Sequence, residues 1–328
     1  MQKITRETLI EKASALLADG KVNRVLGWKN GEFCYDVTPA IFESAEQMNK
    51  DFVYGDFSGA NFSKYLVKET KKDGKVLVFL KPCDTYSFNQ LLTEHRFDRE
   101  KVYAVGIPCD GMVDVNKIKQ IVGDGIVSLS SEGENIRVET LYDGEKVIAK
   151  KDVLSERCAN CKSKKHVAYD ELIGEDGSVI DNNRFDEVEK LEKMTADERF
   201  AFWQNELSRC IRCNACRDVC PACTCEKCVF DNPNSGVENK AAANSFEEKM
   251  FHIIRAFHVA GRCTDCGECS RVCPQHIPLH LLNRKFIKDI NSFYGDYQAG
   301  EQVGSRAPLV NYTKEDIEPC DAVKKGDE

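Results

Sequence analysis

The sequence predicts a mixed N-terminal domain of the α/β or α+β class, followed by a mainly α-helical domain that presents cysteine-rich loops. The first domain is predicted by two apolar runs, 75–80 and 101–106, which each lead into a Pro-Cys-Asp turn and then a helix-like segment. Successive strand–loop–helix units are typical of a sheet with parallel strands. The second domain is predicted by a repeat, in which a helix with a capping-box sequence leads into a cysteine run at Cys210 and again at Cys263.

Each remaining element of the first domain has a local signal. Predicted helices begin at a polar N-cap, such as Thr5 or Asp84, or carry an apolar face; they cover residues 5–17, 85–93 and 116–122. Asn-Gly and Asp-Gly turns predict hairpins over 22–37 and 136–150. Phe33, in the first hairpin, is expected in the core or in a cross-strand pair.

A charged segment over 176–193 marks the boundary between the two predicted domains. We expect an α/β domain over residues 1–175 and a helical domain with both cysteine runs over 176–290. Residues 291–328 are polar and poorly periodic, and we expect them to form an extended C-terminal tail. A chain of 328 residues is long enough for two such domains.

The composition excludes several classes of protein. The formal net charge is −8, whereas a general nucleic-acid-binding protein carries a basic surface, so no nucleic-acid partner is expected. No apolar run approaches the roughly 20 residues of a membrane-spanning helix, and the first residues lack the apolar core of a signal peptide. We therefore expect a cytoplasmic protein without a membrane span. The 17 cysteines are clustered, with eleven between Cys210 and Cys273, which indicates metal ligation and not disulfide cross-linking.

Two cysteine runs dominate the second domain. Each has the spacing C-x2-C-x2-C-x3-C-P, which binds 4Fe–4S clusters in two-cluster ferredoxins, with the fourth cysteine ligating the other cluster. This crossing predicts a first cluster on Cys210, Cys213, Cys216 and Cys273, and a second cluster on Cys263, Cys266, Cys269 and Cys220. Zinc needs one tetrahedral set of ligands and fits two identical runs poorly. The second domain is therefore expected to be a helical, ferredoxin-like domain with two clusters.

Further cysteines are candidates for a third metal site. The pairs Cys158/Cys161 and Cys225/Cys228 would give a complete set of four thiolates, with Cys223 as an alternative ligand. Such a set suits a third 4Fe–4S cluster or a structural zinc ion, and the alternative is that the pairs bind no metal.

Cys83 and Cys109 occupy the two Pro-Cys-Asp turns of the first domain. Ligands of α/β proteins usually lie beyond the carboxyl ends of parallel strands, so these thiols are candidates for a flavin (FAD) or partner surface. The alternative is that both are buried and inert. No Gly-rich nucleotide motif occurs in this region. His276 and His280 follow the second run and either donate hydrogen bonds to cluster sulfurs or are ordinary surface and core residues.

Several short segments match a known family. They are Lys81-Pro-Cys-Asp84, Val105-Gly-Ile-Pro-Cys109-Asp-Gly111, Arg157-Cys-Ala-Asn-Cys161 before Tyr169-Asp-Glu171, and the run from Cys210 with its Pro-Ala-Cys223-Thr-Cys225 extension. On these residues the chain resembles the beta-subunit family of anaerobic hydrogenases and formate dehydrogenases. That family includes deazaflavin-reducing enzymes, one component of anaerobic sulfite reductase, and the sulfhydrogenase beta subunit.

The resemblance implies an electron-carrying subunit of a larger oxidoreductase. Deazaflavin-linked members bind FAD in the α/β region, whereas the sulfhydrogenase type carries three cubane clusters and passes electrons to a separate flavin subunit. The two complete runs and the extra cysteines place this chain nearer the sulfhydrogenase type.

Three functions are consistent with the sequence. The first is an electron relay between a catalytic partner, of the hydrogenase, formate dehydrogenase or heterodisulfide-reductase-like type, and a flavin subunit. The second is an FAD-binding subunit that converts hydride to single electrons for a deazaflavin or nicotinamide couple. The third is a non-catalytic assembly module stabilised by its metals. No spacing nominates a catalytic residue, so substrate chemistry is expected on another subunit.

Overall fold

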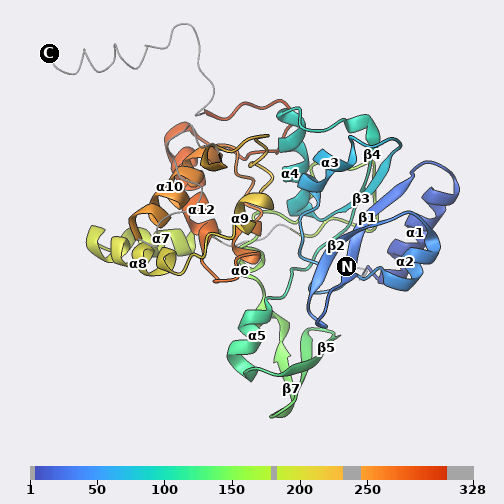
Figure 1. Ribbon diagram of the computed structural model, residues 1–328, viewed down its shortest axis with the longest axis horizontal. Coiled ribbons are helices and arrows are strands. Elements are labelled where there is room, and N and C mark those ends of the chain that lie inside the picture. Colours follow the sequence, from blue (N-terminus) through green and yellow to red (C-terminus); the bar gives the residue numbers. More distant parts are fainter. Residues whose placement is uncertain (1–3, 179–182, 232–244, 309–328) are drawn as a thin grey trace, which may run out of the picture.

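The computed structural model describes residues 4–178, 183–231 and 245–308 (Figure 1). A mixed α/β part with a largely parallel sheet is followed by a mainly helical part that carries both cysteine runs. The fold class predicted from the sequence is thereby confirmed. In Figure 1 the sheet lies to the right and the helical part to the left, so the two parts stand side by side.

The first part is built on a five-stranded sheet in the order β2-β1-β3-β4-β8. The strands cover Arg24–Asn30 (β1), Val37–Phe42 (β2), Val76–Leu80 (β3), Val102–Gly106 (β4) and Glu171–Leu172 (β8). β1, β3, β4 and β8 are parallel, and β2 pairs with β1 as an antiparallel edge strand. All of β3 is buried, as expected for a central strand covered on both faces. The Pro-Cys-Asp turns therefore follow two neighbouring parallel strands and lie at the same edge of the sheet.

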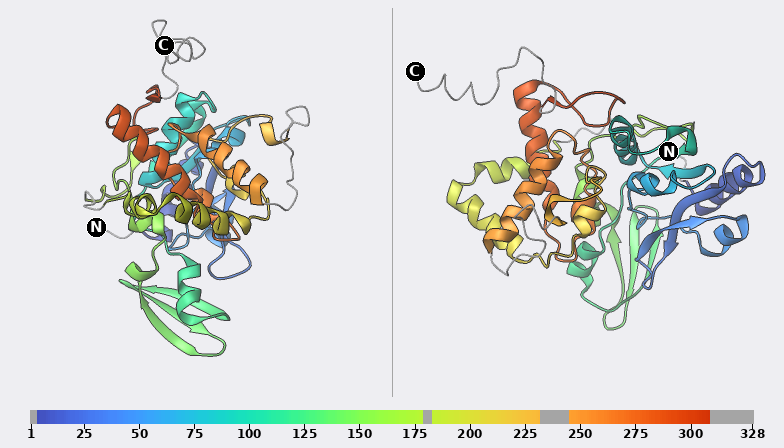
Figure 2. Two further views of the ribbon diagram at one scale, coloured as in Figure 1. Left: turned by 90° about the vertical axis from the view of Figure 1, so that its left-hand side faces the viewer. Right: turned by 45° about the horizontal axis from the view of Figure 1, so that its top comes forward.

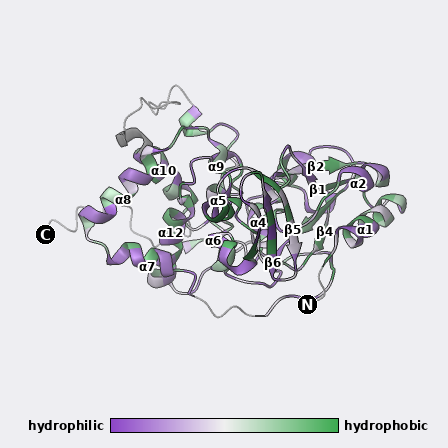
Figure 3. Cartoon of the chain, turned by 90° about the horizontal axis from the view of Figure 1, so that it is seen from below, coloured by the Kyte–Doolittle hydropathy of each residue, from purple (hydrophilic) through white to green (hydrophobic). Residues whose placement is uncertain are grey.

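Helices and aromatic side chains cover this sheet. The helices are α1 (Arg6–Ala18), α2 (Ala45–Asp51), α3 (Leu66–Glu69) and α4 (Pro82–Thr93), with short 3-10 helices η1 (Ser63–Tyr65) and η2 (Arg99–Lys101). Thr5 caps α1 through its side-chain oxygen, as predicted. The core is centred on Trp28, whose ring contacts those of Phe62 and Phe79. Figure 3 shows hydrophobic residues concentrated on the central strands, whereas the outer helices are largely hydrophilic.

A small antiparallel sheet projects from the body of the molecule (Figure 2). Its strands are β5 (Ile126–Glu132), β6 (Asn135–Thr140) and β7 (Gly144–Ala149), in that order. The sheet packs on α5 (Val115–Val122) around its own apolar core, and β7 leads into η3 (Lys150–Val153). Lys150 and Asp56 form a half-buried ion pair, 2.5 Å between Nζ and Oδ1, which ties this sheet to the main body.

The second part is a group of helices around the cysteine runs. Its elements are α6 (Glu156–Ala159), α7 (Asp186–Lys193), α8 (Ala196–Ser208), α9 (Ala215–Asp218), η4 (Val229–Asp231), α10 (Ser245–Val259), α11 (Glu268–Arg271) and α12 (Leu279–Tyr294). α10 packs against α8 and α12, and α12 also contacts α7. Thr195 and Glu198 form the predicted capping box of α8. The capping box expected at Ser245 rests on side chains outside the described residues.

Buried polar contacts join the two parts. The Asn61 amide donates to Glu268 Oε2 (3.1 Å), and the Ser87 and Thr264 hydroxyls lie 2.7 Å apart. Glu94 accepts two hydrogen bonds from the Arg262 guanidinium, at 2.8 and 2.7 Å. Buried polar groups are costly to leave unpaired, so these contacts fix one relative orientation of the two parts.

Three details differ from the sequence prediction. The first hairpin turns over residues 31–36, closed by a hydrogen bond from the Gly31 amide to the Asp36 carbonyl (2.5 Å), and Phe33 is exposed in that loop. Helix α4 begins at Pro82, because proline is favoured at the first helical position, and Asp84 therefore caps from the third position. Helix α12 continues past residue 290, where the tail was expected, and residues 309–328 of that tail lie outside the described part.

Within the described ranges, every helix is too short or too polar to cross a lipid bilayer.

Candidate iron–sulfur sites

The four cysteines predicted to bind the first cluster line one pocket, with about 330 Å³ of empty space. They are Cys210, Cys213, Cys216 and Cys273. Three come from the first run, and Cys273 comes from the end of the second run, after α11. Cys273 of the second run thus lies in the same pocket as three thiols of the first run.

The two runs share an unusual backbone conformation. Arg212 and Asn214 in the first run have positive φ, and so do Asp265 and Gly267, the equivalent residues of the second run. Left-handed residues turn the backbone sharply, so successive cysteines point into the loop instead of along one strand or helix. The Arg212 amide accordingly faces the Cys210 sulfur at 3.4 Å. In the second run, the main-chain N–H groups of Asp265 and Glu268 likewise donate to Cys263 and Cys266.

In the second predicted set, Cys266 and Cys269 are buried, whereas Cys263 and Cys220 are partly buried. Burial, with the Glu268 carboxylate and the Cys220 thiol nearby, raises the pKa of Cys266 to about 11. Burial likewise raises the pKa of Cys269 to about 12, although Arg255 acts against this increase and Cys220 adds to it. Such thiols are neutral without a metal, and ligation would release their protons.

A third group of four thiols lines another pocket, with about 420 Å³ of empty space. It consists of Cys83, Cys109, Cys158 and Cys161. Cys83 lies in the first turn of α4, Cys109 follows β4, and the other two belong to α6 and the turn after it. Burial and the neighbouring Cys158 thiol raise the pKa of Cys109 to about 11. The pocket therefore lies at the carboxyl edge of the sheet, where β3 and β4 end.

This arrangement changes the composition of the expected third set. Cys158 and Cys161 were paired with Cys225 and Cys228, but neither of the latter lines the pocket, and Cys225 is exposed. The thiols that line the pocket together with the Cys158/Cys161 pair are Cys83 and Cys109, because parallel strands bring these two residues to one edge of the sheet. Cys223, the alternative ligand, forms a hydrogen bond with Cys220, which lowers the pKa of Cys220.

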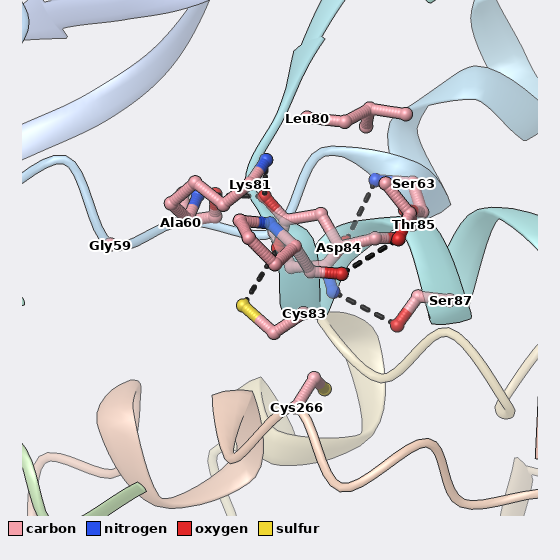
Figure 4. Close-up of polar contacts among 12 residues, drawn as sticks. Gly59, Ala60, Ser63, Leu80, Lys81, Cys83, Asp84, Thr85, Ser87 and Cys266 are labelled. Atoms are coloured by element: carbon pink, nitrogen blue, oxygen red, sulfur yellow. Dashed lines mark hydrogen bonds and ion pairs between the residues drawn. The ribbon is translucent and has the colours of Figure 1, made fainter. Parts of the chain in front are cut away.

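The third pocket is adjacent to the second thiol set. Asp265 and Cys266 of the second run form part of its wall, and Figure 4 shows Cys266 across from Cys83. Arg157, immediately before Cys158, donates to the Cys266 carbonyl at 2.5 Å. Because Cys269 of the second set also packs with Cys216 of the first set, the second set contacts both of the others.

Cations surround the third pocket. Arg157, Lys162 and Lys164 line it, and Lys164 Nζ donates to the Cys109 carbonyl at 2.7 Å. Behind the pocket, Lys81 and Asp84 form a fully buried ion pair with 2.7 Å between Nζ and Oδ2 (Figure 4). Positive charges stabilise thiolates, so this surrounding suits a group with several negative ligands.

Four thiolates are the donor set of a 4Fe–4S cluster and also of a structural zinc ion. Zinc–sulfur bonds of about 2.3 Å bring tetrahedral thiolates within about 3.8 Å of one another, whereas a cubane holds its ligands at separate corners. In residues 4–178, 183–231 and 245–308, no three His, Cys, Asp or Glu side chains converge on a single ion position. The pockets and their four-cysteine linings thus match the donor set of 4Fe–4S clusters.

The histidine near the sulfurs is not one of the two expected. His276 Nδ1 lies 3.1 Å from the Asn116 amide, and His280 contacts Ser270 and Glu156. Instead, His252 of α10 places Nε2 3.3 Å from Cys210 Sγ. No cysteine-run motif includes this residue, and only its position on the buried face of α10 could have indicated it.

Comparisons with known proteins agree with this geometry. Residues 206–277 match the family model of the 4Fe-4S dicluster domain. The F420-dependent formate dehydrogenase subunit beta of Methanocaldococcus jannaschii is 24% identical over 83% of this chain and 86% of its own length. The F420-dependent formate dehydrogenase 1 subunit beta of Methanococcus maripaludis is also 24% identical, over 89% of this chain and 92% of its own.

Among solved structures, the chain is similar to one in the F420-reducing [NiFe] hydrogenase complex from Methanosarcina barkeri. The identity is 16%, over 47% of this chain and 58% of the other, with a TM-score of 0.36. Residues 206–277 therefore carry a 4Fe–4S dicluster domain, and most of the chain is similar to the beta subunits of F420-dependent formate dehydrogenases.

Proposed function

We propose that this chain is the iron–sulfur electron-transfer subunit of a multi-subunit oxidoreductase and carries three 4Fe–4S clusters in a row. The observation that carries the proposal is the contiguity of the three thiol sets. Cys216 of the first set and Cys269 of the second pack in the same apolar group, and Cys266 of the second set lines the third pocket. When bound, each cluster supplies a site that accepts and releases one electron at a time.

The ligand assignment follows from this row. The first and second clusters take the crossed sets predicted from the sequence. The third takes Cys83, Cys109, Cys158 and Cys161, which supports a cluster in preference to zinc because the thiols are spread around a pocket. Other residues would support the clusters. Main-chain amides face the cysteine sulfurs, and Arg157, Lys162 and Lys164 would offset the negative charge of the third cluster.

The two ends of the row are suited to different partners. Cys213 in the first set is exposed, whereas the third pocket opens beside the carboxyl edge of the sheet. An electron carrier needs an entry and an exit, so we propose that one end faces the catalytic partner and the other a flavin subunit. The curated relatives named above are formate dehydrogenase subunits, which supports a formate dehydrogenase as the catalytic partner.

A second candidate function is supported by the same relatives. Both are called F420-dependent, and a subunit that handles this deazaflavin must exchange hydride for single electrons. A flavin performs that conversion, so the alternative is that this chain itself binds FAD. The pocket at the carboxyl edge of β3 and β4 is where ligands of such sheets usually lie.

Metal and flavin content of the anaerobically purified chain tests the proposal. Three clusters predict about twelve irons and as many sulfides per chain, with no zinc. About eight irons with one zinc would contradict the third cluster. Stoichiometric FAD, released on denaturation, would favour the second candidate.

Matched cysteine variants test the composition of the third site. Cys109→Ser and Cys158→Ser should each lower the iron content to about eight per chain, since one four-iron cluster is lost. Cys225→Ser is the control, and it should retain about twelve. If Cys225→Ser lost iron and Cys109→Ser kept its full iron content, the proposed third set would be wrong. The result would instead support the set predicted from the sequence, in which Cys158 and Cys161 are joined by Cys225 and Cys228.

A further inference from the structure

Arg255 is a buried cation in the middle of helix α10. Its side chain is 4% exposed, and Nη2 donates to the Cys216 carbonyl at 2.8 Å. Its Nε is also buried and has no hydrogen-bond partner among the described residues. No described carboxylate forms an ion pair with it. Arginine is almost never buried without a compensating charge, because an isolated buried cation costs several kcal/mol.

Arg255 contacts the first dicluster site at the Cys216 carbonyl, and Cys216 packs in one apolar group with Cys269 of the second set. Cys216 belongs to the first set, and Cys220 and Cys269 belong to the second; Cys223 lies nearby. Although burial alone lowers the pKa of a guanidinium, these thiols hold the pKa of Arg255 above its ordinary value. In return, Arg255 acts to lower the pKa of Cys216 and of Cys269. One guanidinium is thus electrostatically coupled to both sets.

We infer that Arg255 is the shared counter-charge of the first and second clusters and raises the reduction potential of both. The inference rests on the two clusters of the proposed function. Reduction adds one electron to a cluster and so one negative charge, and a fixed cation at close range favours the more negative state. Arginine keeps its charge at any working pH, so the effect does not depend on protonation. Because one cation serves both sites, its removal must move both potentials in the same direction.

Potentiometric titration with dithionite, followed by electron paramagnetic resonance, tests this on the anaerobic full-length chain. Arg255→Met should shift both dicluster potentials downward, each by at least tenfold in the reduction equilibrium constant, which is 59 mV for one electron. Arg255→Lys keeps the charge and should leave both potentials near those of the unchanged protein. Arg209→Met is the control: it removes a charge next to Cys210, but Arg209 is exposed and paired with Glu206, so solvent screens it.

Two results would overturn the inference. One is a shift of only one potential, or of neither, in Arg255→Met with its iron retained. The other is loss of iron from all three variants, Arg255→Lys, Arg255→Met and Arg255→Gln. Lysine preserves the positive charge, so such a loss would show that the packing of the arginine side chain matters and not its charge. Loss confined to the two neutral variants would support the role of the charge. The iron content of the unchanged protein tests separately whether the clusters exist. Failure of the proposed function can therefore be distinguished from failure of the inference about Arg255.

Discussion

The guanidinium of Arg157 lies 2.7 Å from the carboxylate of Glu268, and both side chains are buried. Arg157 precedes Cys158 of the third set, and Glu268 lies between Cys266 and Cys269 of the second. Glu268 also pairs with Arg271, and these two cations lower its pKa to about 2 despite its burial. The pair therefore joins the walls of two neighbouring cluster sites.

Replacement of Glu268 by glutamine should strongly destabilise the chain. The substitution leaves Arg157 buried without its carboxylate, and breaking a buried ion pair in this way costs about 3–5 kcal/mol. The measurement is the midpoint of anaerobic unfolding in guanidinium chloride. Glu187→Gln, at an exposed pair with Lys190, is the control and should cost less than about 1 kcal/mol. Equal midpoints for the two variants would contradict a structural role for the buried pair.

Gly267→Ala should disturb the second and third sites together. Gly267 has φ +67°, and an added Cβ would lie 2.6 Å from Arg157 Cδ and 2.7 Å from its Cβ. We expect lower iron retention at both sites in addition to a backbone cost of roughly 1–3 kcal/mol. Gly20→Ala is matched in conformation, with the same φ of +67° but nothing within 4 Å of the new Cβ. If both variants retained iron equally, the contact with Arg157 would be unimportant.

His252→Phe should lower the potential of the first cluster alone. A ligating thiolate can only accept a hydrogen bond, so Nε2 of His252 donates to Cys210, and such bonds favour the reduced state. The expected change is up to about tenfold in the reduction equilibrium constant of that cluster, or about 59 mV. His276→Phe, which removes an exposed histidine after the second run, should change neither potential. A matching shift in the second cluster would exclude the assignment of His252 to Cys210.

Thr195→Ala should remove the cap of α8. The Thr195 hydroxyl accepts from the Glu198 amide at 3.3 Å, and the Glu198 carboxylate accepts in return from the Thr195 amide at 2.8 Å. Loss of such a cap costs about 1 kcal/mol, which anaerobic thermal unfolding would register as a lower midpoint. Ser208→Ala alters the other end of the same helix, where the hydroxyl only contacts the Asn205 carbonyl, and should have little effect.

The sequence predicted the helical part well because the signals there are local. Each run brings three of its cysteines together within seven residues, and the crossing of the fourth is a property of the paired motif. Strands β3 and β4 were predicted for a similar reason, since a short apolar run bounded by turns needs no distant partner to be recognised.

The third set has different partners in the structure from those predicted, because its members are distant in sequence. Cys83 and Cys109 become neighbours of Cys158 only through the parallel pairing of β3 and β4 and the approach of α6. The signal was nonetheless present: two Pro-Cys-Asp turns after adjacent strands supply two thiols to one edge, and the Cys158/Cys161 pair completes four. The prediction for Phe33 was wrong for the opposite reason. The local Asn-Gly sequence predicted a tight turn before Phe33, whereas the pairing register of β1 and β2 leaves Phe33 in the loop between these strands.

The third pocket also has a consequence for how the chain survives in air. Its four thiols come from three segments spread over residues 83–161, so a cluster bound there would act as a cross-link that closes two long loops. Metal-binding free energy at such a site is folding free energy. Oxidative loss of that cluster would release the β3 and β4 ends and α6 at once, and increased cleavage of the aerated chain between residues 83 and 161 in limited proteolysis would measure it. The four thiols of the third pocket would thereby make the folding of this region depend on the absence of oxygen.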